Sequence, residues 1–275
     1  MKPSYCHILV TKMNQMYNFL LTILFLYIST AESTDPSAYF CNNNTETNNN
    51  TQLSRNIDAL LPRLVQGAIQ NGFLATSYGS GANQIYGLGQ CRADVSSNDC
   101  SACIRDAAEQ SRKLCPNQAD VRIWYDYCFL KYNTVEFFGQ VDTSYGVFFW
   151  NVVNVNDPNV FNQKLGALVD QIESEAVKLP GSKGLGKGET EISTFETLYA
   201  LVQCTRDLSA INCAQCLAVA IGNFNTYCKD KKGCRVLYGS CYVRYELYPF
   251  FFPLDSQGSL VGNAAKYESF KVYKP

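Results

Sequence analysis

Thirteen cysteines and a single histidine are the residues of this 275-residue chain that most restrict its chemistry. The histidine, His7, lies in an N-terminal segment that we expect to be removed. Without it, the chain lacks the base of a Ser–His–Asp triad or a Cys–His pair and the commonest metal ligand. Carboxylate-only glycosidase chemistry would need an acid pair of suitable spacing, and no such pair stands out. The sequence therefore predicts a protein that is not an enzyme. Its net charge of −1 gives no basic excess for binding nucleic acid.

Two cysteine pairs, Cys100-x2-Cys103 and Cys213-x2-Cys216, have the spacing of a zinc site or a redox dithiol. Cys6 lies in the N-terminal segment that we expect to be removed on export, which leaves twelve cysteines, an even number. We therefore interpret both pairs as parts of structural disulfides. We therefore expect no metal.

The glycine-rich run at 181–188 imitates the phosphate-binding loop GxxxxGK. However, Gly188 stands where that loop has the Ser or Thr that holds magnesium, and Pro180 and a helical pattern precede the run instead of a strand. We therefore predict a flexible loop between strands, and no cofactor.

Residues 1–31 have the pattern of a secretory signal peptide. Lys2 and Lys12 are the only charged residues up to Ala31, an apolar run covers 17–28, and small residues follow at 29–31. About twelve apolar residues span roughly 18 Å as a helix, which is too short for a hydrocarbon core of about 30 Å. We expect cleavage after Ala31 and export without a membrane anchor.

Twelve cysteines remain after that cleavage, and ten of them form two sets with identical spacing, shifted by 113 positions. Gln90 and Gln203, and Asp94 and Asp207, obey the same shift. The chain is therefore a tandem duplication. The two sets are Cys91-x8-Cys100-x2-Cys103-x11-Cys115-x12-Cys128 and Cys204-x8-Cys213-x2-Cys216-x11-Cys228-x12-Cys241.

Hydrophobic periodicity predicts similar elements in both units. In the first unit we expect an extended segment at 39–41, a helix at 52–71 kinked at Pro62, strands at 73–78 and 85–91, a helix capped by Asn98 or Asp99 that ends at 111, and a strand at 121–133. In the second we expect helices at 158–179 and 211–226, and strands at 195–204, 234–247 and 267–273.

These elements predict an α+β fold of two tandem disulfide-rich modules, each an antiparallel sheet packed against two helices. We place the first module at 32–138, a linker with the first strand of the second unit at 139–157, and the second module at 158–275. The apolar run at 147–150 should hold that first strand by burial and join the two units.

The cysteine framework, with RVLYGSC and YVRYELYPF in the second unit, resembles the plant cysteine-rich repeat secretory proteins built from ginkbilobin-homologous (stress-antifungal) domains. The resemblance covers nearly all of the mature chain, twice. Similar domain pairs form the ectodomains of cysteine-rich receptor-like kinases and plasmodesmata-located proteins, which carry a membrane helix after the second domain. The given sequence shows no such apolar stretch after the second unit. We therefore expect it to resemble the free branch of the family, which is secreted to the apoplast.

Cys41 and Cys234 lie outside the repeated sets, and equivalent bridges would take both to equivalent partners. The sequons at Asn43 and Asn49 lie in a polar run and predict N-glycosylation. The disulfides that the resemblance implies are Cys41–Cys115, Cys91–Cys100, Cys103–Cys128, Cys204–Cys213, Cys216–Cys241 and Cys228–Cys234.

The resemblance also implies a site for mannose, held by an Asn after the first cysteine, an Arg six residues before the last one and a Glu five residues after it. An amide donates and accepts, and charged groups make strong hydrogen bonds to vicinal hydroxyls. In the first unit Asn42 and Arg122 match, while Asn133 stands at the Glu position. In the second, Arg235 and Glu246 match and the Asn has no visible counterpart. The bland alternative is that these are ordinary cross-strand charges.

Two functions stay open from the sequence. The first is a defence protein of the apoplast that binds mannose-type glycans in a lectin-like way, with antifungal action. The second is a non-catalytic module that pairs with related receptor ectodomains. The aromatic run at 244–252 fits a strand and its core better than a ligand platform.

Overall fold

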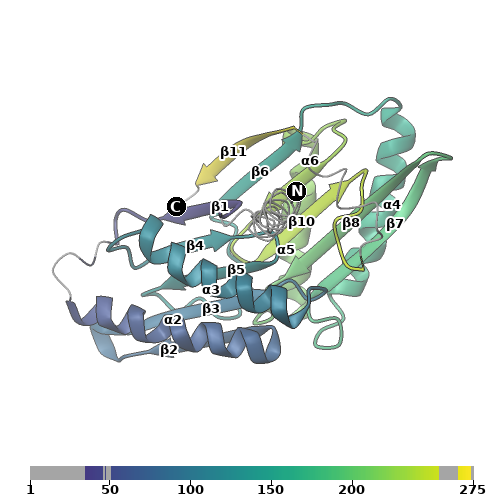
Figure 1. Cartoon of the computed structure of the whole chain (residues 1–275). Coiled ribbons are helices and arrows are strands. Elements are labelled where there is room, and N and C mark those ends of the chain that lie inside the picture. The colour runs from purple at the N-terminus through teal and green to yellow at the C-terminus, as the bar shows by residue number, and fades with distance from the viewer. Residues whose placement is uncertain (1–34, 46, 48–50, 254–265, 274–275) are drawn as a thin grey trace, which may run out of the picture. The chain divides into compact units, whose positions relative to one another are not determined.

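The computed structural model describes residues 35–45, 47, 51–253 and 266–273 (Figure 1). The expected signal peptide at 1–31 and the sequon at Asn49 lie outside the described residues.

The first module is a five-stranded antiparallel sheet in the order β1-β4-β5-β3-β2, with α2 and α3 side by side on one face (Figure 1). Leu60 and Leu64 of α2 and Ile104 of α3 pack fully buried against sheet residues such as Ile123 and Leu130. The elements are β1 (Ala38–Cys41), α2 (Thr51–Asn71), β2 (Phe73–Tyr78), the 3-10 turn η1 (Gly81–Asn83), β3 (Ile85–Cys91), α3 (Ser97–Leu114), β4 (Val121–Trp124) and β5 (Cys128–Asn133).

The second module repeats this order as β6-β9-β10-β8-β7 and adds one strand, β11, outside β6. The added strand pairs with β6 along its whole length, from Tyr267 opposite Asn151 to Tyr273 opposite Tyr145. The elements are β6 (Tyr145–Asn151), α4 (Pro158–Ala176), β7 (Leu185–Ser193), β8 (Glu196–Cys204), α5 (Ala210–Gly222), α6 (Phe224–Tyr227), β9 (Cys234–Leu237), β10 (Cys241–Glu246) and β11 (Tyr267–Tyr273).

The α+β prediction is confirmed, and several element boundaries are corrected. The single strands expected at 121–133 and 234–247 are hairpins, β4–β5 and β9–β10. Ser96, rather than Asn98 or Asp99, caps α3, because its hydroxyl accepts the Asp99 amide. Pro62 lies inside α2 without ending it, and the second unit's later helix divides into α5 and α6 at Asn223.

The glycine-rich run at 181–188 is only in part a loop, because β7 begins at Leu185. A β-carbon built on Gly186 would clash with the carbonyl oxygen of Ile172 in α4. The glycine therefore serves close helix–strand packing rather than phosphate binding.

Six disulfides join the twelve cysteines in the arrangement that the family resemblance implies. Three lie within the first module and three within the second, and none joins the two modules. They are Cys41–Cys115, Cys91–Cys100, Cys103–Cys128, Cys204–Cys213, Cys216–Cys241 and Cys228–Cys234.

The two modules meet through a hydrophobic cluster that contains Trp124 of β4, Val147 of β6 and Leu237 of β9. The indole Nε1 of Trp124 donates to the carbonyl oxygen of Tyr238, at 3.0 Å. The run at 147–150 thus contributes to this junction through Val147, while Phe148 turns into the core of the second module.

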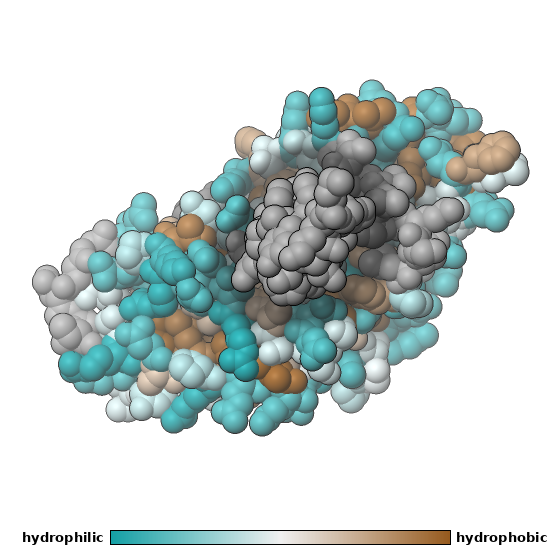
Figure 2. All heavy atoms as spheres, in the orientation of Figure 1, coloured by the Kyte–Doolittle hydropathy of each residue, from teal (hydrophilic) through white to brown (hydrophobic). Residues whose placement is uncertain are grey.

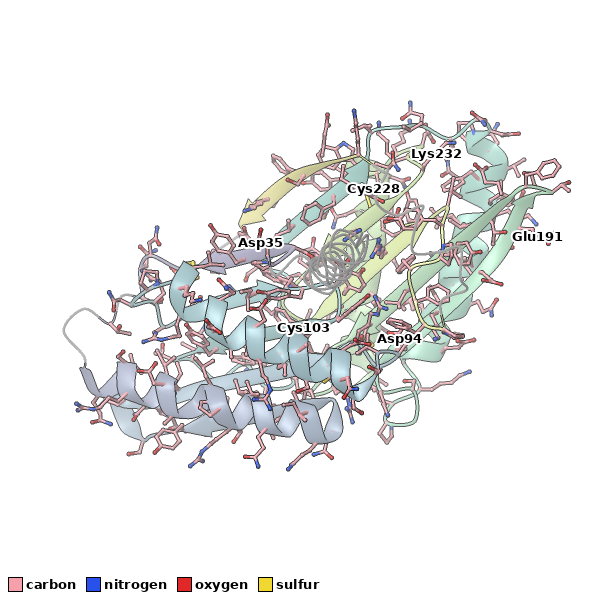
Figure 3. All side chains as sticks on the ribbon, viewed as in Figure 1. Asp35, Asp94, Cys103, Glu191, Cys228 and Lys232 are labelled. Atoms are coloured by element: carbon pink, nitrogen blue, oxygen red, sulfur yellow. A yellow bond between two sulfur atoms is a disulfide. The ribbon has the colours of Figure 1, made fainter. Side chains whose placement is uncertain are left out.

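The repeated aspartates make reciprocal bonds across the same junction. Asp94, labelled in Figure 3, accepts the backbone amide of Phe252 at 2.8 Å, and Asp207 accepts that of Gly139 at 2.9 Å. Gln90 adds two more bonds, to the carbonyl oxygen of Cys204 and from the amide of Arg206. Asp94, Asp207 and Gln90, which all obey the shift of 113 positions, therefore help to dock one module on the other.

Candidate functional site

The first module brings Asn42 and Arg122 together through a residue that the sequence analysis missed, Asp120. Asn42 follows β1, and its side-chain amide donates to Asp120 Oδ2 at 3.0 Å. Arg122, in β4, places Nη1 3.4 Å from Asp120 Oδ1. Asp120 and Arg122 are both buried, so this carboxylate and guanidinium are held in fixed positions.

A second carboxylate fixes the other side of the Arg122 guanidinium. Asp142 Oδ2 accepts from Arg122 Nε at 2.9 Å and from the ammonium group of Lys131 at 3.2 Å. Burial by itself would raise the pKa of Asp142, but Lys131 and Arg122 together outweigh it and hold that pKa well below its usual range. Burial lowers the pKa of Lys131, against the opposing effect of Asp142.

Asp120, Arg122, Lys131 and Asp142 line a pocket of about 480 Å³ between the sheet and the segment at 133–144, whereas Asn42, which holds Asp120, is not part of its lining. Asn133 also lines it, and its side-chain oxygen accepts the backbone amide of Val135 at 3.0 Å. Among the described residues, Arg122 Nη1 has its ion pair with Asp120 but no hydrogen-bond partner. The lining of the pocket therefore places a guanidinium beside carboxylates and the Asn133 amide, which are groups that hydrogen-bond to polyhydroxylated ligands.

In the second module Arg235 and Glu246 also meet, but the site is closed. Arg235 Nε lies 3.6 Å from Glu246 Oε1, and Arg235 Nη1 donates to Asp126 at 2.9 Å. Glu246 is fully buried and accepts from Arg244 Nε at 2.9 Å and from the hydroxyl of Tyr267 at 2.5 Å.

The expectation that the second unit lacks the asparagine is wrong. Cys41 pairs with Val121 in the first sheet, and Trp150 pairs with Cys234, the repeat equivalent of Val121, in the second. Asn151, which follows Trp150, therefore stands in the place of Asn42. Its backbone amide donates to Gly233 as that of Asn42 does to Asp120, at 2.9 and 3.0 Å. Its side-chain oxygen accepts the amide two residues later, as that of Asn42 does.

The carboxylate of the site comes from different places in the two modules, because Asp120 directly precedes β4 whereas Glu246 is the last residue of β10. Gly233 is the repeat equivalent of Asp120, and a β-carbon built on Gly233 would clash with Glu246 Oε2. The Glu246 carboxylate thus fills the space that the Asp120 side chain takes in the first module. We call Asn42, Arg122 and Asp120 the first-module set, and Asn151, Arg235 and Glu246 the second-module set.

A larger groove, of about 680 Å³, lies between α2 and α3 and has apolar walls of Leu61, Val65 and Ile69. Brown, hydrophobic spheres gather between these helices in Figure 2. Among the described residues, no three His, Cys, Asp or Glu side chains are placed to share a metal ion. In the same part of the chain, no helix combines the length and the apolar character needed to cross a bilayer.

The profile of a family described as "Salt stress response/antifungal" matches the chain twice, at residues 40–135 and 151–248. The chain is 52% identical to Cysteine-rich repeat secretory protein 55 of Arabidopsis thaliana, over 85% of this chain and 90% of that protein. It is 37% identical to the Antimicrobial ginkbilobin-2-like protein of Castanea crenata, over 85% of this chain and 95% of the relative. Among solved structures it is similar to the tandem DUF26 ectodomain of the Arabidopsis thaliana cysteine-rich receptor-like protein PDLP8, with a TM-score of 0.68, 27% identity, and coverage of 78% of this chain and 98% of that one.

Proposed function

This chain belongs to the salt stress response/antifungal family, and we propose that it is a non-catalytic defence or stress protein of the apoplast that binds mannose-type glycans in the pocket of its first module. The two relatives given above support a secreted defence or stress protein, because one is named as a cysteine-rich repeat secretory protein and the other as an antimicrobial protein. The expected signal peptide is the basis for secretion.

The Arg122 guanidinium beside the Asp120 carboxylate carries the glycan proposal, because its Nη1 has an ion pair with Asp120 but no hydrogen-bond partner among the described residues. Two adjacent sugar hydroxyls need a donor and an acceptor side by side, and this pair supplies both at the wall of an open pocket. Losing one charge-assisted hydrogen bond should cost about 1.5–3 kcal/mol, which corresponds to roughly a tenfold to hundredfold loss of affinity.

We expect Asp120→Asn and Asn42→Ala each to weaken the binding of mannose oligomers by about tenfold to a hundredfold, as measured by titration calorimetry. Asn133→Glu alone should also weaken it, because the new carboxylate would compete with Asp120 for the same space. The double variant Asp120→Gly/Asn133→Glu copies the second-module arrangement and should restore binding. Glu189→Gln, at an exposed position in β7, is the matched control.

The absence of mannose binding by the wild-type protein would overturn this proposal. So would a gain of affinity from Asn133→Glu alone, since that would show that Asp120 does not supply the carboxylate.

The second candidate is pairing with related receptor ectodomains, which the likeness to a receptor-like ectodomain favours. A glycan array and a binding assay against such ectodomains, run on the same secreted protein, separate the two candidates. We also propose N-glycosylation at Asn43, which is exposed, and mass spectrometry of the secreted protein tests it.

A further inference from the structure

The second-module set is complete, yet a tyrosine of the same chain occupies it. Tyr267 lies directly opposite Asn151 in the pairing of β11 with β6. Its hydroxyl donates to Glu246 Oε2 at 2.5 Å, and the Arg235 guanidinium lies 5.2 Å from the centre of its ring. Tyr267 therefore touches or faces the amide, the cation and the carboxylate of the set.

A second phenol completes the closure. Tyr248 exchanges a hydrogen bond of 2.9 Å with the hydroxyl of Tyr267 and accepts one of 3.0 Å from Arg244. Burial, and then the nearby Glu246 carboxylate, raise the pKa of Tyr267 far above its usual value, so its hydroxyl keeps its proton and donates it.

Among the residues that the structure describes, neither of these phenols has a counterpart at the first-module set. Position 135, the repeat equivalent of Tyr248, is a valine that is 68% exposed, whereas Tyr248 is 8% exposed. The edge strand of the first sheet is β1, while in the second sheet β11 covers the equivalent strand β6. Asp120 and Arg122 of the first-module set thus line an open pocket, whereas Tyr248 and Tyr267 cover the second-module set.

We propose that Tyr267 is an intramolecular ligand of the second-module set: its phenol hydroxyl takes the place of a ligand hydroxyl, docks β11 on the sheet, and leaves the first module as the site for free ligand. The interpretation of the set as hydroxyl-binding rests on the proposed function. The docking role of the Tyr267 hydroxyl does not, because it follows from the contacts of β11 alone.

The first test is hydrogen exchange on the full mature chain. Tyr267→Phe keeps the ring and removes only the hydroxyl, so the amides of β6 and β11 should exchange about tenfold faster than in the wild type. Ser269→Ala, at an exposed position in the same strand, should change these rates less than twofold. Unchanged exchange in Tyr267→Phe would overturn the proposal.

The second test asks whether the vacated site recognises a hydroxyl. Tyr267→Ala should leave a cavity that 4-methylphenol fills, which would raise Tm, while toluene of similar shape should raise it clearly less. Equal rescue by both compounds would overturn the proposal, because only ring packing would then matter.

If Tyr267→Ala does not fold, the exchange experiment on Tyr267→Phe still decides. Neither test uses a glycan, so a wild-type protein that binds no mannose would refute the proposed function and leave the present proposal standing.

Discussion

Replacing Asp142 by alanine is expected to lower the free energy of unfolding by about 3–5 kcal/mol, because it removes the carboxylate that two buried cations share and leaves only the Asp120–Arg122 ion pair to balance them. The side chains of Arg122 and Lys131 are only 8% and 5% exposed, and Asp142 contacts both. Urea denaturation of the two proteins measures the loss.

Two variants control this experiment. Asp170→Ala removes an exposed carboxylate from α4 and should change the stability by less than about 0.5 kcal/mol. Lys131→Met added to Asp142→Ala should recover part of the loss, since one of the stranded cations is removed. A loss of under about 1 kcal/mol in Asp142→Ala would contradict this prediction, because it would show that Asp120 and solvent are enough to stabilise the two cations.

The Asp142 carboxylate also makes the free energy of unfolding depend on pH, with stability lost as the pH falls. The folded-state pKa of Asp142 is depressed, so its contribution is fully present above its unfolded pKa of about 3.9 and is lost as the pH falls through the lower folded value. Asp126, whose side chain is 47% exposed, acts in the same direction, because Arg235 and Arg244 outweigh the desolvation of its carboxylate and lower its pKa to about 2. We therefore expect full stability at pH 5 and a steep loss below about pH 4, which Asp142→Asn should flatten.

The cysteine spacing was enough to predict the modules, because a disulfide framework repeats with the fold that it constrains. The hairpins were harder to predict. Tyr125 and Tyr127 continue the alternation of β4 through the turn, so the periodicity of β4 and β5 looks like one strand. The start of β7 was hidden for a different reason, since Gly186 is required by the approach of α4, a contact that no local pattern shows.

The site was half visible in the sequence. Arg122 and Arg235 obey the shift of 113 positions and were found, but Asn151 is offset from Asn42 by a different number and emerged only from the strand register. Asp120 was missed because the first module supplies the carboxylate from the residue before β4, whereas the second module supplies it from Glu246 at the end of β10. Such an exchange conserves the place of a charge in space and not its position in the chain.

Removing the Cys41–Cys115 disulfide should destabilise the protein by about 2 kcal/mol more than removing Cys228–Cys234. The first bridge joins residues 74 positions apart, and the second joins residues only 6 apart. On the chain-entropy model they contribute roughly 4.5 and 2.4 kcal/mol. Urea denaturation of Cys41→Ala/Cys115→Ala and Cys228→Ala/Cys234→Ala compares them directly.

The two disulfide variants should also unfold locally at different strands. Only the first bridge fixes a first strand, because β6 has Trp150 where β1 has Cys41 and is held instead by the buried Val147 and Phe148 and by β11. Limited proteolysis should therefore cleave next to β1 in the first double variant and leave β6 protected in the second. Equal losses of stability, with β1 still protected, would show that pairing with β4 alone holds β1. Because Asn42 directly follows Cys41, the first variant should also lose mannose binding, which links that disulfide to the geometry of the proposed site.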